Sequence, residues 1–233
     1  LVSTVNCSAT VIRRAAEELR IEGALDAFPN VDGVAAFAHG SGCGMADGGP
    51  GWRALQRVLT GHAGHPNVGA ALFVGLGCEV MQIARMKQEL GAAARFHGLT
   101  IQQNGGTRAT IEAIKLRVRQ MLPQVNAALR ASAPASALKI GLQCGGSDGF
   151  SGITANPALG LASDMLAAQG ASVVLSETPE IYGAERLLLD RAASPDIAQR
   201  LLDRIAWWQD YTARNGASLD NNPSPGNKAG GLT

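Results

Sequence analysis

The chain has 233 residues, of which 46% are hydrophobic and 17% are charged, and its formal net charge is +1. This composition is typical of a globular protein with a sizeable core and excludes a largely disordered chain. Aromatic residues are only 4% of the chain, and no basic stretch is interleaved with them, so nucleic acid is not an expected partner. Because no apolar run reaches about 18 residues and no signal peptide opens the chain, we expect no membrane partner and a cytoplasmic location.

Short apolar runs alternate with amphipathic stretches through residues 1–130. Apolar runs predict strands, and apolar residues at spacings of three and four predict helices. The predicted strands are residues 1–5, 31–38, 68–74 and 99–102. The predicted helices lie around residues 11–19, 52–59, 80–90 and 111–122. In the last of these helices, Lys115, Arg117 and Arg119 occupy alternate positions, and we interpret them as a solvated face.

An Ala/Ser/Pro-rich segment at residues 131–137 interrupts this alternation and predicts a linker. Beyond it, we expect strands at residues 138–142 and 172–175 with a helix at 157–169 between them. Ser194 followed by Pro195 predicts a helix start, with Ser as the N-cap. The whole pattern predicts an α/β fold of parallel sheets with flanking helices, Rossmann-like, in two lobes. The lobes are residues 1–130 and 138–233, joined by the linker.

Each of the four cysteines follows a predicted strand: Cys7, Cys43, Cys78 and Cys144. The carboxyl ends of parallel strands lie at one edge of a sheet, where ligands bind. A lone cysteine is more often an inert core residue, but four at strand ends favour a shared site. The chain has no CxxC pair, which disfavours a zinc ribbon or a thiol-redox protein.

Thiolates with a nearby His and Glu suit iron or zinc. We predict metal ligation by Cys43, Cys78 and Cys144, with Cys7 in reserve. The alternative set is Cys7, Cys43 and Cys78, all from the first lobe. Three thiolates would hold a [4Fe–4S] cluster with one open iron, and a mononuclear Fe²⁺ with mixed ligands is equally compatible.

Glycine pairs follow two of the predicted strands, Gly105-Gly106 in the first lobe and Gly145-Gly146 in the second. Turns of this kind before a helix can point backbone N–H groups at a carboxylate. The alternative is that the glycines serve only the turns. The substrate-binding residues predicted from these turns are Asn104, Gly105, Gly106, Thr107, Gly145, Gly146 and Ser147.

Eight motifs in one order resemble the altronate and galactarate dehydratase family. They are residues 4–7 (TVNC), 39–43 (HGSGC), 65–67 (HPN), 75–79 (GLGCE), 105–108 (GGTR), 141–149 (GLQCGGSDG), 176–180 (SETPE) and 222–228 (NPSPGNK). The resemblance implies an iron-dependent cytoplasmic hydro-lyase that acts on a sugar acid and forms a homodimer, and Lys228 is added as a substrate contact. It also implies that a β-rich N-terminal domain and the end of the catalytic lobe lie outside this chain.

The implied reaction is the elimination of water from a sugar acid such as altronate or galactarate, which gives a 2-keto-3-deoxy acid. This chemistry needs a base and an acid near the substrate. The candidates at the ligand edge are His39, Glu79, Asp148 and Glu177, together with Glu180. The alternatives are a sulfo-lyase acting on sulfolactate and a non-catalytic subunit that binds sugar acids.

Overall fold

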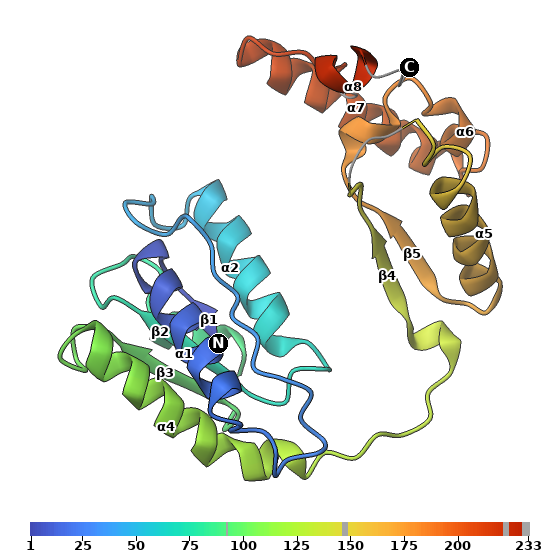
Figure 1. The fold of residues 1–233 in the computed structure, drawn as a ribbon. Helices are drawn as coiled ribbons and strands as arrows, with labels where there is room; N and C mark the ends of the chain where they lie inside the picture. Colours follow the sequence, from blue (N-terminus) through green and yellow to red (C-terminus); the bar gives the residue numbers. More distant parts are fainter. Residues whose placement is uncertain (92, 146–148, 221–223, 230–233) are drawn as a thin grey trace. The chain divides into compact units, whose positions relative to one another are not determined.

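The computed structural model describes residues 1–91, 93–145, 149–220 and 224–229. The chain divides into two compact units, Leu1–Arg130 and Ala131–Thr233. In both units, helices alternate with short parallel strands (Figure 1). This arrangement confirms the predicted α/β class.

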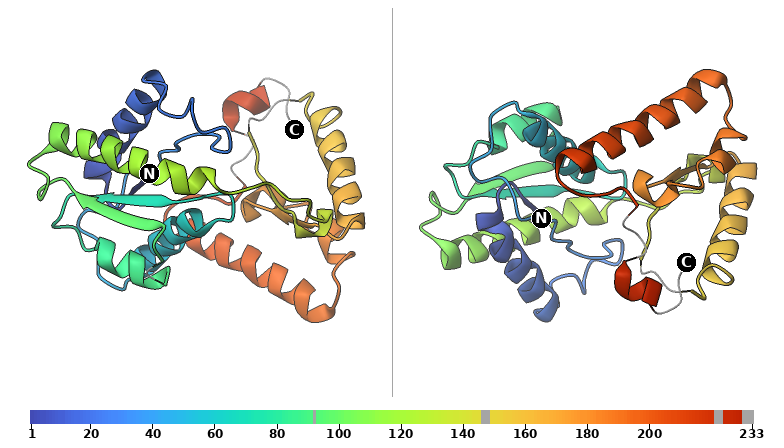
Figure 2. Two further views of the ribbon diagram at one scale, coloured as in Figure 1. Left: turned by 90° about the horizontal axis from the view of Figure 1, so that it is seen from below. Right: turned by 90° about the horizontal axis from the view of Figure 1, so that it is seen from above.

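The first unit contains a three-stranded parallel sheet in the order β1-β2-β3. Its helices cover both faces, as the two views in Figure 2 show. In chain order, its elements are β1 (Val2–Ser3), a 3₁₀ turn (Asn6–Ser8), α1 (Ala9–Ile21), α2 (Pro50–Gly64), β2 (Ala71–Gly75), α3 (Ile83–Glu89), β3 (Phe96–Thr100) and α4 (Thr107–Asn126).

The middle strand, β2, is the centre of the core, and all five of its residues are buried. Because successive side chains of a strand point to opposite faces, Leu72 and Val74 pack in one cluster with apolar residues of α1 and α4. Ala71 and Phe73 pack in a second cluster with residues of α2 and α3. The continuous apolar run that predicted this strand therefore reflects burial on both faces.

The prediction of a strand at residues 31–38 is wrong. Phe37 forms a single isolated bridge with Val2. Its backbone N–H donates to the Leu1 carbonyl at 2.8 Å, and its carbonyl accepts from Ser3 N–H at 3.0 Å. The apolar residues Val31, Val34 and Ala36 instead pack their side chains against the core, which satisfies the apolar pattern without a ladder of backbone hydrogen bonds.

The second unit contains a two-stranded parallel sheet of β4 (Lys139–Leu142) and β5 (Ser172–Leu175). No residue of these strands or of α5 is buried. Its other elements are a 3₁₀ turn (Ala135–Ala137) within the predicted linker, α5 (Ala155–Ala168), a second 3₁₀ turn (Thr178–Ile181), α6 (Arg186–Leu189), α7 (Pro195–Arg214) and α8 (Pro225–Ala229).

The predicted helix start at Ser194 is confirmed, because the Ser194 side chain accepts a hydrogen bond from Ile197 N–H at 3.3 Å. The helix that follows, α7, has 20 residues, the same length as α4. In the described part of the chain, neither these nor any other helix is both long and apolar enough to cross a membrane.

Candidate functional site

Three loops of the first unit meet at the carboxyl edge of its sheet. Cys7 follows β1, Cys78 follows β2, and Asn104 follows β3. Because the three strands are parallel and adjacent, their ends lie side by side. The thiols of Cys7, Cys43 and Cys78 are all exposed to solvent. This edge therefore presents exposed thiols next to a buried core.

The loop that carries Cys43 is seated on the end of β1. Asn6 N–H donates to the Ser41 carbonyl at 2.8 Å. Gly42 is buried with φ +97°, and a Cβ placed on it would lie 2.7 Å from the Thr4 carbonyl oxygen. Only glycine allows both this conformation and this close approach. The contacts hold the segment before Cys43 against the segment before Cys7.

His39 braces the same loop with both ring nitrogens. Its Nε2 lies 3.0 Å from the Ser3 carbonyl, and its Nδ1 accepts from Ser41 N–H at 3.2 Å. These partners match a neutral ring that carries its proton on Nε2. For His39 to transfer a proton to or from a substrate, its ring would have to break one of these two hydrogen bonds.

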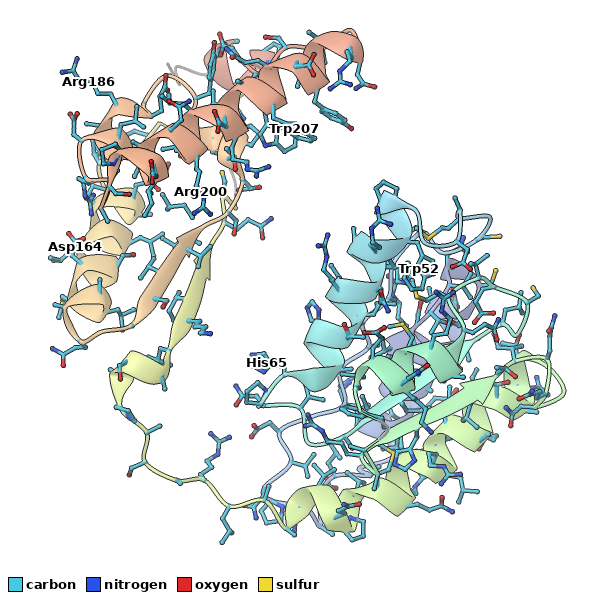
Figure 3. The ribbon with its side chains drawn as sticks, turned by 180° about the vertical axis from the view of Figure 1, so that it is seen from behind. Trp52, His65, Asp164, Arg186, Arg200 and Trp207 are labelled. Carbon is cyan, nitrogen blue, oxygen red and sulfur yellow. The ribbon has the colours of Figure 1, made fainter. Side chains whose placement is uncertain are left out.

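A surface contact joins the segment after Cys43 to the helix after Cys78. Arg85 of α3 forms an ion pair with Asp47 at 2.7 Å. Its guanidinium lies 4.3 Å from the ring centroid of Trp52, which Figure 3 labels at the start of α2. The pair is partly exposed and contributes about 0–1 kcal/mol at most. It nevertheless brings the two cysteine-bearing segments into one connected surface.

The side chain of Glu79 points into the fold, although its neighbour Cys78 is exposed. Glu79 is only 6% exposed. Its Oε1 accepts from Thr4 Oγ1 at 2.7 Å, and its Oε2 accepts from Gly77 N–H at 2.6 Å. Both oxygens are therefore engaged by protein donors.

The turn after β3 uses its backbone N–H groups differently from the prediction. Gly105 and Gly106 have φ values of +78° and +109°, and a Cβ on either would meet nothing within 4 Å. Gly106 N–H donates to the Ile101 carbonyl at 3.0 Å, and the Asn104 side chain donates to the Thr100 carbonyl at 2.7 Å. These two donors bond to carbonyls within the turn itself. Thr107 opens α4, whose first N–H groups have no partner within the helix.

Gln102 is a residue of this edge that the sequence pattern did not identify. It is exposed, and a Cβ on Gly77 would lie 2.5 Å from its Oε1. Its backbone N–H donates to the Leu76 carbonyl at 3.0 Å. The predicted strand ran to residue 102, whereas β3 ends at Thr100. A predicted strand that ended at residue 100 would have placed Gln102 in the loop after β3.

The second unit brings Cys144 and Glu177 together at the ends of β4 and β5. Glu177 Oε2 accepts from Cys144 N–H at 2.7 Å. Lys228 lies in α8 and is exposed. A Cβ on Gly145 would meet nothing within 4 Å. The predicted site residues Gly146, Ser147 and Asp148 lie outside the described residues.

The predicted metal ligands come from both units, with Cys7, Cys43 and Cys78 in the first and Cys144 in the second. All four cysteine thiols are free and exposed. No three His, Cys, Asp or Glu side chains among the described residues come close enough together to hold a metal ion. Thiolates are chemically suited to iron, but the ligand geometry that iron requires is not seen in this part of the chain.

Comparison with known proteins matches both units to one family. Residues 1–126 match the second domain of D-galactarate dehydratase/altronate hydrolase, and residues 135–233 match the C-terminal domain of D-galactarate/altronate dehydratase.

Three relatives are similar over most of the chain. The altronate dehydratase of Bacillus subtilis is 37% identical over 234 residues, which cover 100% of this chain and 46% of that protein. The altronate dehydratase of Escherichia coli is 40% identical over 87% of this chain and 40% of its own length. The galactarate dehydratase (L-threo-forming) of Escherichia coli is 40% identical over 72% of this chain and 34% of its own length. The chain thus spans less than half the length of these relatives and belongs to the D-galactarate/altronate dehydratase family.

Proposed function

We propose that the protein containing this chain is a hydro-lyase that removes water from a sugar acid such as altronate or galactarate. The observation that carries this proposal is the 37% identity to an altronate dehydratase across the whole chain. The exposed side chains at the carboxyl edge of the first sheet support it, since this edge is where α/β folds bind ligands. The product would be a 2-keto-3-deoxy acid.

The elimination removes the proton beside the carboxylate and expels the hydroxyl group one carbon further along. Proton transfer by positioned side chains contributes roughly 10²–10⁴-fold. We propose Glu177, Asp148 and His39 for these transfers. Glu177 is supported by its half-buried carboxylate, which Cys144 N–H holds in one orientation. Glu79 differs from Glu177 because its carboxylate is buried and both of its oxygens accept from protein donors.

We propose that the chain holds the substrate carboxylates with the turns after β3 and β4. In the first turn, the donors are the N–H groups that open α4 at Thr107, together with the exposed Gln102. In the second turn, they are Gly145, Gly146 and Ser147, and Lys228 would add a positive charge. Asn104, Gly105 and Gly106 would shape the first turn.

We propose iron as the cofactor, either as Fe²⁺ or as an iron–sulfur cluster, with the cysteine thiolates as ligands. The chemistry that bound iron supplies is Lewis-acid polarisation of the substrate carboxylate or hydroxyl. The ligands would be Cys43, Cys78 and Cys144 with Cys7 in reserve, or the three thiolates of the first unit. Iron analysis of Cys7→Ser and Cys144→Ser separates these sets, because only the variant that lacks a ligand loses iron.

The direct test uses the full-length protein, purified without oxygen and assayed for iron, sulfide and turnover of a panel of sugar acids. We expect bound iron and formation of a keto-deoxy product from a hexonate or hexarate. Release of sulfite from sulfolactate would indicate a sulfo-lyase instead. Binding of a sugar acid without turnover, with iron present, would indicate a non-catalytic subunit. We further propose a cytoplasmic homodimer, which sedimentation of the same preparation tests.

A further inference from the structure

The buried carboxylate of Glu79 joins the ends of two neighbouring strands. Thr4, which donates to its Oε1 at 2.7 Å, directly follows β1 and is fully buried. Gly77, which donates to its Oε2 at 2.6 Å, lies two residues beyond β2. The second bond spans residues 77 and 79, so it closes a tight turn with Cys78 at its centre.

The surrounding backbone leaves room for this carboxylate. A Cβ placed on Gly75 would lie 1.9 Å from Glu79 Oε1, so any larger residue there would displace the carboxylate. Gly77 has φ +128°, a conformation that favours glycine. Gly75 and Gly77, one on each side of Leu76, therefore leave space for the carboxylate. The exposed thiol of Cys78 lies at the tip of the turn.

We infer that Glu79 is a positioning residue that fixes the Cys78 turn, and that it does not serve as the base of the reaction. A base must reach the proton that it removes from the substrate. Both oxygens of Glu79 instead face donors inside the protein, and only 6% of the residue is exposed. The catalytic consequence of this inference rests on the proposed dehydratase function.

Glutamine at position 79 separates the two roles. Its carbonyl oxygen can accept from Gly77 N–H, and its amide can donate to Thr4 Oγ1. The Thr4 hydroxyl is then free to donate to the Val74 carbonyl, which already lies 3.4 Å away. A carboxamide keeps both contacts but cannot accept a proton as a base. We therefore expect Glu79→Gln to keep turnover within about threefold, whereas loss of a base would lower turnover by roughly 10²–10⁴-fold.

A second readout needs no turnover. The full-length protein is freed of iron with a chelator, so that no thiol is masked by the proposed metal, and is treated with a limiting amount of iodoacetamide. The alkylation rate of each cysteine is measured by peptide mass spectrometry. Thr4→Val removes one hydrogen bond and leaves the charge of Glu79 in place. We expect Thr4→Val and Glu79→Ala to raise the Cys78 rate about fivefold over wild type, the equilibrium equivalent of one hydrogen bond. Glu79→Gln should leave it unchanged.

The controls are internal and external. Cys7, Cys43 and Cys144 report general loosening, because unfolding raises all four rates together, and thermal melting checks each variant. Glu89, ten residues after Glu79, is exposed at the end of α3. Glu89→Ala and Glu89→Gln should therefore change neither the Cys78 alkylation rate nor turnover.

Two results would overturn the inference. One is a Glu79→Gln variant that alkylates as wild type but loses turnover by a hundredfold or more. The other is a Thr4→Val variant in which the Cys78 rate is unchanged relative to the other cysteines. If the wild-type protein converts no sugar acid, the proposed function fails, and the alkylation rates still decide the role of Glu79 in the turn.

Discussion

Glu177 is the one described residue other than glycine whose backbone has a positive φ, at +60°. For an L-amino acid this conformation costs roughly 1–2 kcal/mol. It places the carboxylate where it accepts from Cys144 N–H at 2.7 Å. Strain of this kind persists where the surroundings hold it, and it concentrates at functional sites. The geometry agrees with a site residue whose orientation is fixed before substrate binds.

Substitutions at position 177 separate the strain from the hydrogen bond. Glu177→Ala and Glu177→Gly both remove the acceptor, but only glycine relieves the positive φ. We expect both to destabilise the protein and Glu177→Gly to be the more stable of the two by about 1 kcal/mol. Urea denaturation monitored by circular dichroism measures the difference. Equal stability of the two variants would show that the backbone strain is relieved in another way.

The glycines of the Cys43 loop provide a second test at this scale. Gly42 and Gly44 both have positive φ, at +97° and +67°, but only Gly42 lies against backbone atoms. Gly44→Ala should therefore cost about 1 kcal/mol through strain alone. Gly42→Ala should cost roughly 3 kcal/mol or more, because its Cβ would also collide with Thr4 and Val5. Denaturation of both variants gives the comparison, and equal costs would contradict the close packing of this loop on β1.

Helices α1 and α4 are joined by a cluster of ionic contacts around Lys115. This residue is only 7% exposed. Its Nζ lies 3.0 Å from Glu18, 2.7 Å from Glu22 and 3.2 Å from Glu112. The prediction that Lys115, Arg117 and Arg119 form a solvated face is therefore wrong for Lys115, since the sequence does not show which carboxylates pack against it.

The cluster predicts acid sensitivity. Hydrogen bonds from Lys115 lower the pKa of Glu18 and of Glu22 below the usual value of 4.5. Their contribution to stability is present above that value and is lost as pH falls through the lowered pKa values. We expect the melting temperature of wild type to fall below pH 4.5, and Lys115→Met to lower it at pH 7 and flatten this dependence. Arg13→Met, at an exposed position of α1, is the control; a Lys115→Met profile that falls as steeply as wild type would contradict the expectation.

The continuous apolar run predicted β2, whose residues are all buried, and the Ser-Pro pair predicted the start of α7. The apolar pattern could not predict that residues 31–38 form no strand. A segment that packs its side chains on the core has the same apolar pattern as a segment that pairs its backbone with a sheet. The sequence pattern placed Glu79 just after β2, where the structure also has it. The direction of that side chain depends on Thr4, which is 75 residues away in sequence, and no local pattern carries that information.

At the scale of the whole molecule, the two units are joined by an exposed segment. Residues 128–134 have no regular structure and are exposed. Exposed irregular segments are the preferred sites of proteolysis. We expect limited trypsin treatment to cut first after Arg130, which is 85% exposed at its side chain, and to release fragments of residues 1–130 and 131–233 from this chain. Mass spectrometry identifies the products, and a first cut inside α1 or α4 would contradict the division into two units.

The two sheets differ in burial, and this difference has a consequence for amide hydrogen exchange. Every residue of β2 is buried between two neighbouring strands, whereas no residue of β4 or β5 is buried. Amide protons of a central, buried strand exchange with solvent only when the cooperative unit opens, while those of poorly covered strands exchange through local openings. In deuterated buffer, the amides of β2 should be the last to exchange in this chain and those of β4 and β5 among the first within regular structure. Equal protection of the two sheets would mean that both belong to a single cooperative unit, so that denaturing one would denature the other.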